Sequence, residues 1–148
     1  MITTRHEITI DAPVGAVWRL HTDIDAWPEW NRGVDSAALS GELAVGASFR
    51  WLTHGLDITS TVTSLAAGRH IAWGGPASGI DGTHRWTLEP RDGGTLVVTE
   101  ESWSGAPVAA DPEGMLAALD GSLIAWLQDL KAAAEAHGRS GAPRSDAR

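Results

Sequence analysis

Two titratable side chains stand where acid–base chemistry is possible, His84 and Glu101. Residues 83–89 alternate apolar and polar side chains, which predicts a half-buried strand with His84 on its inward face. Glu101 falls in the next predicted strand, and an Asp92-Gly93-Gly94 hairpin joins the two. Counted outward from that turn, both residues stand at a similar depth, so their side chains can lie within hydrogen-bond or one-water reach. We therefore predict a carboxylate–imidazole pair that moves a proton at neutral pH.

Each member of this pair has a second interpretation. A buried histidine is also typical of a neutral core side chain hydrogen-bonded to backbone, and this alternative applies to His84. For Glu101, the orientation depends on which face of its strand is buried. If Val97 points inward, Glu101 is desolvated and its pKa is raised. If Leu96 points inward instead, Glu100 takes that place and Glu101 is a solvated surface charge.

The sequence contains none of the motifs typical of several other kinds of catalytic, metal or cofactor site. The chain has no cysteine, which excludes disulfides, zinc–thiolate sites and cysteine nucleophiles. Its six histidines show no His-x-His or His-Glu-x-x-His spacing. Neither a Gly-x-Ser-x-Gly elbow nor a glycine-rich phosphate loop occurs. We expect no metal and no cofactor.

The aromatic composition is unusual: eight tryptophans stand beside one phenylalanine and no tyrosine. Each buried tryptophan removes roughly 150–250 Å² from water, so these rings either close a core or line an aromatic cavity. In one interpretation Trp30 is a hydrophobic plug at the helix–sheet junction. In the other, Trp27 and Trp30 form the wall of the cavity mouth and Asn31 supplies a polar contact. The predicted ligand-contacting residues are Trp27, Trp30, Phe49, Trp51, Ile58, Ile71, Trp73, Trp86, Trp103, Leu119 and Leu123.

The longest regular segment is a helix predicted over residues 111–137, about 40 Å long. Asp111 is an N-cap type, Pro112 suits the first helical position, and Gly138 is the expected stop. Large apolar residues recur at a 3–4 spacing and form one stripe, which requires a large apolar partner. The stripe consists of Leu116, Leu119, Leu123, Trp126, Leu127 and Leu130.

Small residues on the same helix fill little space and predict a void if they face a curved sheet. They are Gly114, Ala117, Ala118, Gly121, Ser122 and Ala125. The alternative is that tryptophans fill that space completely. A void of this kind, apolar with a few polar groups, is the common form of a small-molecule site.

The segments before this helix predict strands at 2–10, 34–40, 48–53, 56–63, 69–73, 83–89 and 95–103. Two short helical segments are expected after the first strand, the second over 23–27 and ending before Pro28. Residues 74–79 are expected to form a loop. The prediction is an α+β domain over 1–138, with six or seven antiparallel strands curved around the C-terminal helix. Residues 139–148 are expected to be a disordered tail.

Three stretches carry a family resemblance. They are Ile10-Asp11-Ala12-Pro13 with Val17-Trp18 and Trp27-Pro28-Glu29-Trp30-Asn31; Arg69-His70-Ile71-Ala72-Trp73; and His84-Arg85-Trp86-Thr87-Leu88-Glu89-Pro90 followed by Gly94-Thr95 and Glu100-Glu101-Ser102-Trp103. Over residues 2–137 the chain resembles the helix-grip fold of the START and Bet v 1-like (SRPBCC) superfamily, in its bacterial polyketide cyclase/dehydrase-like branch. The resemblance implies a cavity for an apolar or aromatic small molecule. It does not imply one catalytic set, because the superfamily shares none.

The net charge and the composition of individual segments restrict the possible partners of the protein and its expected location in the cell. The formal charge of −8 and the single lysine argue against nucleic acid or an anionic membrane as a partner. The N-terminal residues contain no apolar run of the kind found in signal peptides, and no apolar segment is long enough for membrane insertion. A cytoplasmic protein is therefore expected. We expect a monomer or homodimer.

Three functions fit these observations, in this order. The first is a cyclase or dehydratase that folds a polyketide-like substrate against tryptophan walls beside His84 or Glu101. The second is a non-catalytic carrier or sensor of a hydrophobic ligand. The third is a protein-interaction module, which would need a filled core and a large exposed apolar patch.

Overall fold

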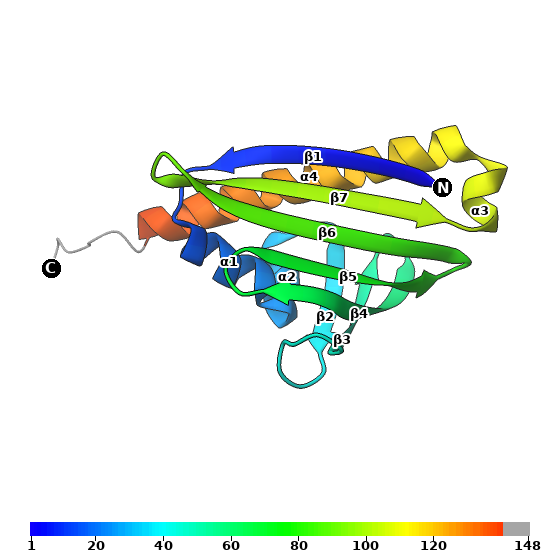
Figure 1. Cartoon of the computed structure of the whole chain (residues 1–148), viewed down its shortest axis with the longest axis horizontal. Coiled ribbons are helices and arrows are strands. Elements are labelled where there is room, and N and C mark those ends of the chain that lie inside the picture. The colour runs from blue at the N-terminus through cyan, green and yellow to red at the C-terminus, as the bar shows by residue number, and fades with distance from the viewer. Residues whose placement is uncertain (141–148) are drawn as a thin grey trace, which may run out of the picture.

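The computed structural model describes residues 1–140, with side-chain surroundings given through residue 138. Seven strands form one antiparallel sheet in the order β1-β7-β6-β5-β4-β3-β2 (Figure 1). Their bounds are β1 Ile2–Ile10, β2 Val34–Leu39, β3 Ser48–Thr53, β4 Leu56–Ala66, β5 His70–Ala77, β6 Ile80–Arg91 and β7 Gly94–Ser104. The predicted α+β architecture, a curved antiparallel sheet with a long C-terminal helix, is confirmed.

Helices occupy the connections and the C-terminal part of the chain. They are α1 Val14–Thr22, the 3-10 helix η1 Ile24–Ala26, α2 Trp27–Trp30, α3 Ala106–Ala110 and α4 Pro112–Ser140. Among the described residues, no helix is long and apolar enough to cross a membrane.

Two helix boundaries differ from prediction, and one helix was not predicted. The second short helical region does not stop before Pro28, because this proline lies in the first turn of α2, where a missing N–H costs no hydrogen bond. Helix α3 was not predicted. Helix α4 starts as expected, with the Gly114 amide donating to Asp111 Oδ1 at 3.0 Å, but it continues through Gly138 to Ser140. Most of the predicted tail, residues 141–148, lies outside the described residues.

Strand β5 is longer than predicted, because residues 74–77 continue it instead of forming a loop. Gly74 and Gly75 of this strand lie close to the backbones of the neighbouring strands. A Cβ on Gly74 would come within 2.8 Å of the Gly82 carbonyl oxygen, and one on Gly75 within 2.6 Å of the Thr59 carbonyl oxygen. Glycine is therefore required here by the neighbouring strands β6 and β4.

Two-residue turns fix the register of the hairpins. His54 and Gly55 join β3 to β4, and Asp92 and Gly93 join β6 to β7, all four with positive φ angles of 48°, 77°, 51° and 84°. Turns of this hand match the right-handed twist of the strands they connect. The second turn aligns β6 and β7 so that His84 stands directly opposite Glu101.

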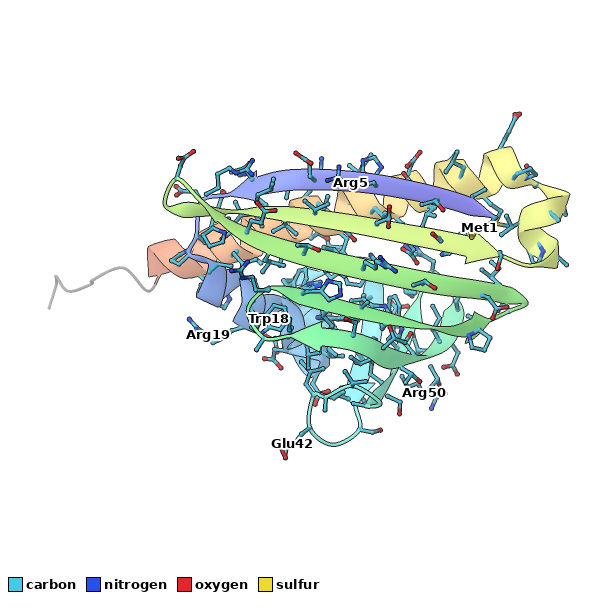
Figure 2. The ribbon with its side chains drawn as sticks, viewed as in Figure 1. Met1, Arg5, Trp18, Arg19, Glu42 and Arg50 are labelled. Atoms are coloured by element: carbon cyan, nitrogen blue, oxygen red, sulfur yellow. The ribbon has the colours of Figure 1, made fainter. Side chains whose placement is uncertain are left out.

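Helix α4 runs along the edge strand β1, behind the sheet in the view of Figure 1. Thr4 and His6 on β1 both contact the Asp120 carboxylate, His6 Nε2 at 2.8 Å, and Lys131 Nζ donates to the Thr9 carbonyl at 2.8 Å. The predicted apolar stripe is buried on this helix, with Leu116 only partly covered. On the opposite face of the sheet, charged side chains such as Arg5 and Arg50 project outward (Figure 2).

Candidate functional site

A cavity of about 990 Å³ lies between the sheet and helix α4. The helix lines it with the small residues predicted to leave a void, with the exception of Gly114, whose neighbour is the capping Asp111. These are Ala117, Ala118, Gly121, Ser122 and Ala125. Small side chains leave the space between helix and sheet unfilled, so the fold contains a pocket as well as an aromatic core.

The cavity is elongated along α4. Its lining runs from Met115 to Asp129, which corresponds to about 21 Å of helix. Ala117, Gly121 and Ala125 are exposed, as is His54 in the turn that faces them across the cavity. The cavity therefore opens to solvent along the helix.

Six of the predicted site residues line this cavity. They are Trp51, Ile58, Trp73, His84, Glu101 and Trp103. They come from β3, β4, β5, β6 and β7, so five consecutive strands of the curved sheet contribute to one wall.

The other predicted ligand contacts lie outside the lining. They are Trp27, Trp30, Phe49, Ile71, Trp86, Leu119 and Leu123. Trp27 and Phe49 pack edge to face at 5.4 Å in the closed aromatic core. Leu119 and Leu123 are fully buried on the side of α4 away from the small residues. The interpretation of Trp30 as a plug fits its place, because Trp30 is partly buried and packs against the core cluster that contains Trp27.

Sequence reasoning missed several lining residues at one end of the cavity. Trp126 was assigned to the apolar stripe alone, although it follows Ser122 by one helical turn and so shares the small-residue face. Asp129 lines the same end and is buried, where Arg32 holds it through Nε at 3.1 Å, Nη2 at 2.9 Å and its backbone amide at 3.0 Å. Asn31, which the sequence had suggested as a polar contact at the cavity mouth, also lines the cavity. No sequence signal links residues 32 and 129.

His84 is buried on β6, with a side chain 3% exposed. Its Nε2 lies 2.9 Å from the Thr99 hydroxyl, and that hydroxyl donates to the Arg85 carbonyl at 3.0 Å. Burial lowers the pKa of His84 well below its ordinary value of 6.5, and the nearby His21 lowers it further. His84 is therefore neutral at physiological pH.

Glu101 is the more exposed member of the pair at the cavity wall, with a side chain 16% exposed. Val97 points inward and is fully buried, so Glu101 faces the cavity, while Glu100 stands opposite Arg85 and Arg5 on the other face. Burial raises the pKa of Glu101 to about 7, although the Trp103 indole N–H, donated at 2.9 Å, acts in the opposite direction. Both protonation states of Glu101 are thus populated near neutral pH.

The two groups meet at the cavity wall. His84 Nδ1 and Glu101 Oε1 are 3.4 Å apart, at the outer limit of hydrogen bonding. His84 Nδ1 is buried and has no other partner among the described residues. Both residues line the cavity, and Glu101 is the more exposed of the two. Within residues 1–138, no cluster of three or more histidine, aspartate or glutamate residues is placed to hold a metal ion.

Comparison with known proteins identifies the family. A family model described as polyketide cyclase/dehydrase and lipid transport matches residues 1–135. The chain belongs to this family. No protein with a curated description matches it.

Solved structures agree with this membership in fold. Zhui aromatase/cyclase from a Streptomyces species is similar with a TM-score of 0.76 and 18% identity, covering 95% of this chain and 96% of that one. A START superfamily protein from Mycobacterium smegmatis is similar with a TM-score of 0.76 and 17% identity, covering 90% and 97%. The protein TTHA0849 from Thermus thermophilus gives 0.79 and 16%, covering 92% and 99%. At these identities the likeness shows the fold alone.

The polyketide cyclase/dehydrase and lipid transport family is named for both catalysis and carriage. Membership, together with the buried aromatic cluster, shows a hydrophobic ligand-binding fold. It leaves the choice between an enzyme and a carrier to the chemistry of the cavity wall.

Proposed function

We propose that this family member binds an apolar, aromatic small molecule in its cavity and acts on it as a polyketide cyclase/dehydratase-like enzyme. The observation that carries the proposal is a proton-holding pair, Glu101 with His84, set into an otherwise largely apolar wall. Trp51, Trp73 and Trp103 supply the aromatic surfaces that hold the substrate in one conformation.

Loss of water from a β-hydroxy ketone is the step that suits this pair. The Glu101 carboxylate removes a proton from the α-carbon, which lies between the carbonyl carbon and the hydroxyl-bearing carbon. The protonated carboxyl then gives that proton to the departing hydroxyl. One C–H and one C–O bond break, a C=C bond forms, and water leaves. No cofactor takes part. A pKa of about 7 suits Glu101 to both halves of this cycle.

The test is turnover of a β-hydroxy ketone that becomes aromatic on dehydration. Glu101→Gln should lower kcat roughly 10²–10⁴-fold, the usual contribution of a positioned acid–base group. Glu100→Gln is the matched control, since the neighbouring Glu100 lies on the other face of the sheet. His84→Gln should also lower kcat. Full activity in a folded Glu101→Gln variant would remove the carboxyl group from the mechanism.

A carrier is the second candidate, and the long opening beside α4 favours it because ligand can enter and leave without rearrangement. Under either function, titration with a polycyclic aromatic should quench tryptophan emission saturably with a Kd in the micromolar range, which corresponds to a binding free energy of about −8 kcal/mol. Binding without turnover in the wild-type protein would select the carrier. An interaction module has less support, since the large exposed apolar side chains among residues 1–138 are Met1, Val45 and Ile124.

A further inference from the structure

Thr99 is a fully buried residue of β7 whose hydroxyl touches His84 but not the cavity. A hydroxyl has one proton to donate, and the Thr99 proton goes to the Arg85 carbonyl, which cannot donate in return. Toward His84 the Thr99 oxygen is therefore an acceptor. The imidazole must supply the proton in that contact, so Nε2 carries the N–H.

This contact fixes the other side of the ring. A neutral imidazole has one N–H, so with the proton on Nε2 the Nδ1 atom presents a lone pair to Glu101. An ionised Glu101 oxygen faces that lone pair without a shared proton, whereas a protonated carboxyl donates to it. The opposite tautomer would place an Nδ1–H against Glu101 and favour the carboxylate.

We propose that Thr99 is a positioning residue that holds His84 in the Nε2–H tautomer, so that Nδ1 accepts a hydrogen bond from the protonated form of Glu101 that the proposed cycle produces. The proposal rests on the proposed function for its catalytic meaning, but the tautomer itself is measurable without a substrate. Thr99 acts through His84 and touches no substrate.

Other titratable groups near the pair are themselves paired or neutral. His21 of α1 acts on His84 and is uncharged. Asp129 of α4 lines the same cavity and is bound by Arg32. On the β1 side, Thr4 is the register partner of Glu101, and it contacts the Asp120 carboxylate. Among these groups, Thr99 is the one that selects a nitrogen of His84.

The experiment compares Thr99→Val, Thr99→Ser and Thr95→Val. Thr95 is the matched control because it is also fully buried on β7 and donates to a carbonyl, that of Ala12 at 2.8 Å, without touching His84. Imidazole ¹⁵N shifts report the tautomer of His84, and a carboxyl ¹³C titration reports the pKa of Glu101. In Thr99→Val the proton should move to Nδ1 and the pKa of Glu101 should fall by about one pH unit. Thr99→Ser and Thr95→Val should keep wild-type values.

The outcomes separate the two proposals. A wild-type spectrum with the proton on Nδ1, or an unchanged pKa of Glu101 in folded Thr99→Val, would overturn the positioning role. If Thr99→Val does not fold, the wild-type and Thr99→Ser spectra decide alone, since both must show Nε2–H. In the turnover assay, the acidic limb of the pH profile, which reports ionisation of the Glu101 base, should move to lower pH in Thr99→Val only. If the tautomer result holds while Glu101→Gln retains activity, the proposed function fails and the role of Thr99 stands.

Discussion

Two buried histidines in this interior have different surroundings. His21 is enclosed by aromatic rings, and Trp86 is the nearest at 4.1 Å between centroids. The other rings within 6.4 Å belong to Trp27, Trp30, Trp73 and Trp126. Neither ring nitrogen of His21 has a hydrogen-bond partner among the described residues. His84 instead has Thr99 at one nitrogen and Glu101 at the other, beside open space.

The comparison separates burial from function. Burial lowers the pKa of both imidazoles, so a shifted pKa does not by itself distinguish a site from a core. What His84 has in addition is a carboxyl group 3.4 Å away and a cavity beside it. Both buried imidazoles make the protein sensitive to acid, and the proposed function gives His84 a second role.

The largest expected effect belongs to His21. Burial lowers its pKa from 6.5 to about 3, so the folded protein keeps it neutral while the unfolded chain protonates it. Its contribution to stability is present above pH 6.5 and is lost as the pH falls toward 3, in total about 5 kcal/mol at ~1.4 kcal/mol per pH unit. Denaturant unfolding between pH 7 and 3 should show wild type losing stability relative to His21→Phe. His137→Phe, at an exposed histidine, should run parallel to wild type; parallel curves for His21→Phe would contradict the assignment.

A core tryptophan and a cavity tryptophan should differ in the next experiment. Trp86→Ala should cost roughly 3–5 kcal/mol, because Trp86 is fully buried in the closed aromatic core. Trp103→Ala should cost less stability, roughly 1–2 kcal/mol, because the Trp103 ring is half-buried at the cavity. For each kcal/mol of stability lost, Trp103→Ala should weaken ligand binding more than Trp86→Ala does. Urea unfolding and fluorophore titration measure both. Equal stability losses would mean that the two rings share one environment.

The sequence was sufficient for the parts of this comparison that depend on local pattern. Alternation in β6 placed His84 inward, and the Asp92-Gly93 turn set the register that brings Glu101 opposite it. The choice between Glu101 and Glu100 was not decidable, because Leu96 and Val97 are both buried, one on each face of β7. Only the covering elements determine which face meets the cavity.

Features that depend on distant neighbours were not predictable. The rotation of α4 about its axis decides that Leu119 and Leu123 are buried away from the cavity while Trp126 lines it. Helical periodicity gives their relative angle but not which side meets the void. Gly75 was assigned to a loop. The need for glycine at this position comes from the backbone of Thr59, sixteen positions earlier on a neighbouring strand, which leaves no room for a Cβ atom.

Glu101 should show the opposite pH dependence to His21. Burial raises its pKa from 4.5 to about 7, so its protonated form stabilises the fold below pH 4.5 and that contribution is lost as the pH rises through 7. Over this range Glu101→Gln should gain about 3 kcal/mol relative to wild type. The difference between variant and wild type must be measured, because His21 and His84 change stability in the other direction over the same range. A flat difference would show that Glu101 is solvated.

The smallest expected stability effect tests the cavity from the helix side. A Cβ at Gly121 or at Gly138 meets no atom within 4 Å, so Leu fits at either position of α4. Both Gly121→Leu and Gly138→Leu should raise stability by about 0.5–1 kcal/mol through helix propensity. Gly121 lines the cavity and Gly138 lies beyond it, so the Gly121 variant alone should weaken binding of a polycyclic aromatic, by roughly tenfold or about 1.4 kcal/mol. Because the two variants share the helix effect, equal ligand affinity in both would place the binding site away from this face of α4.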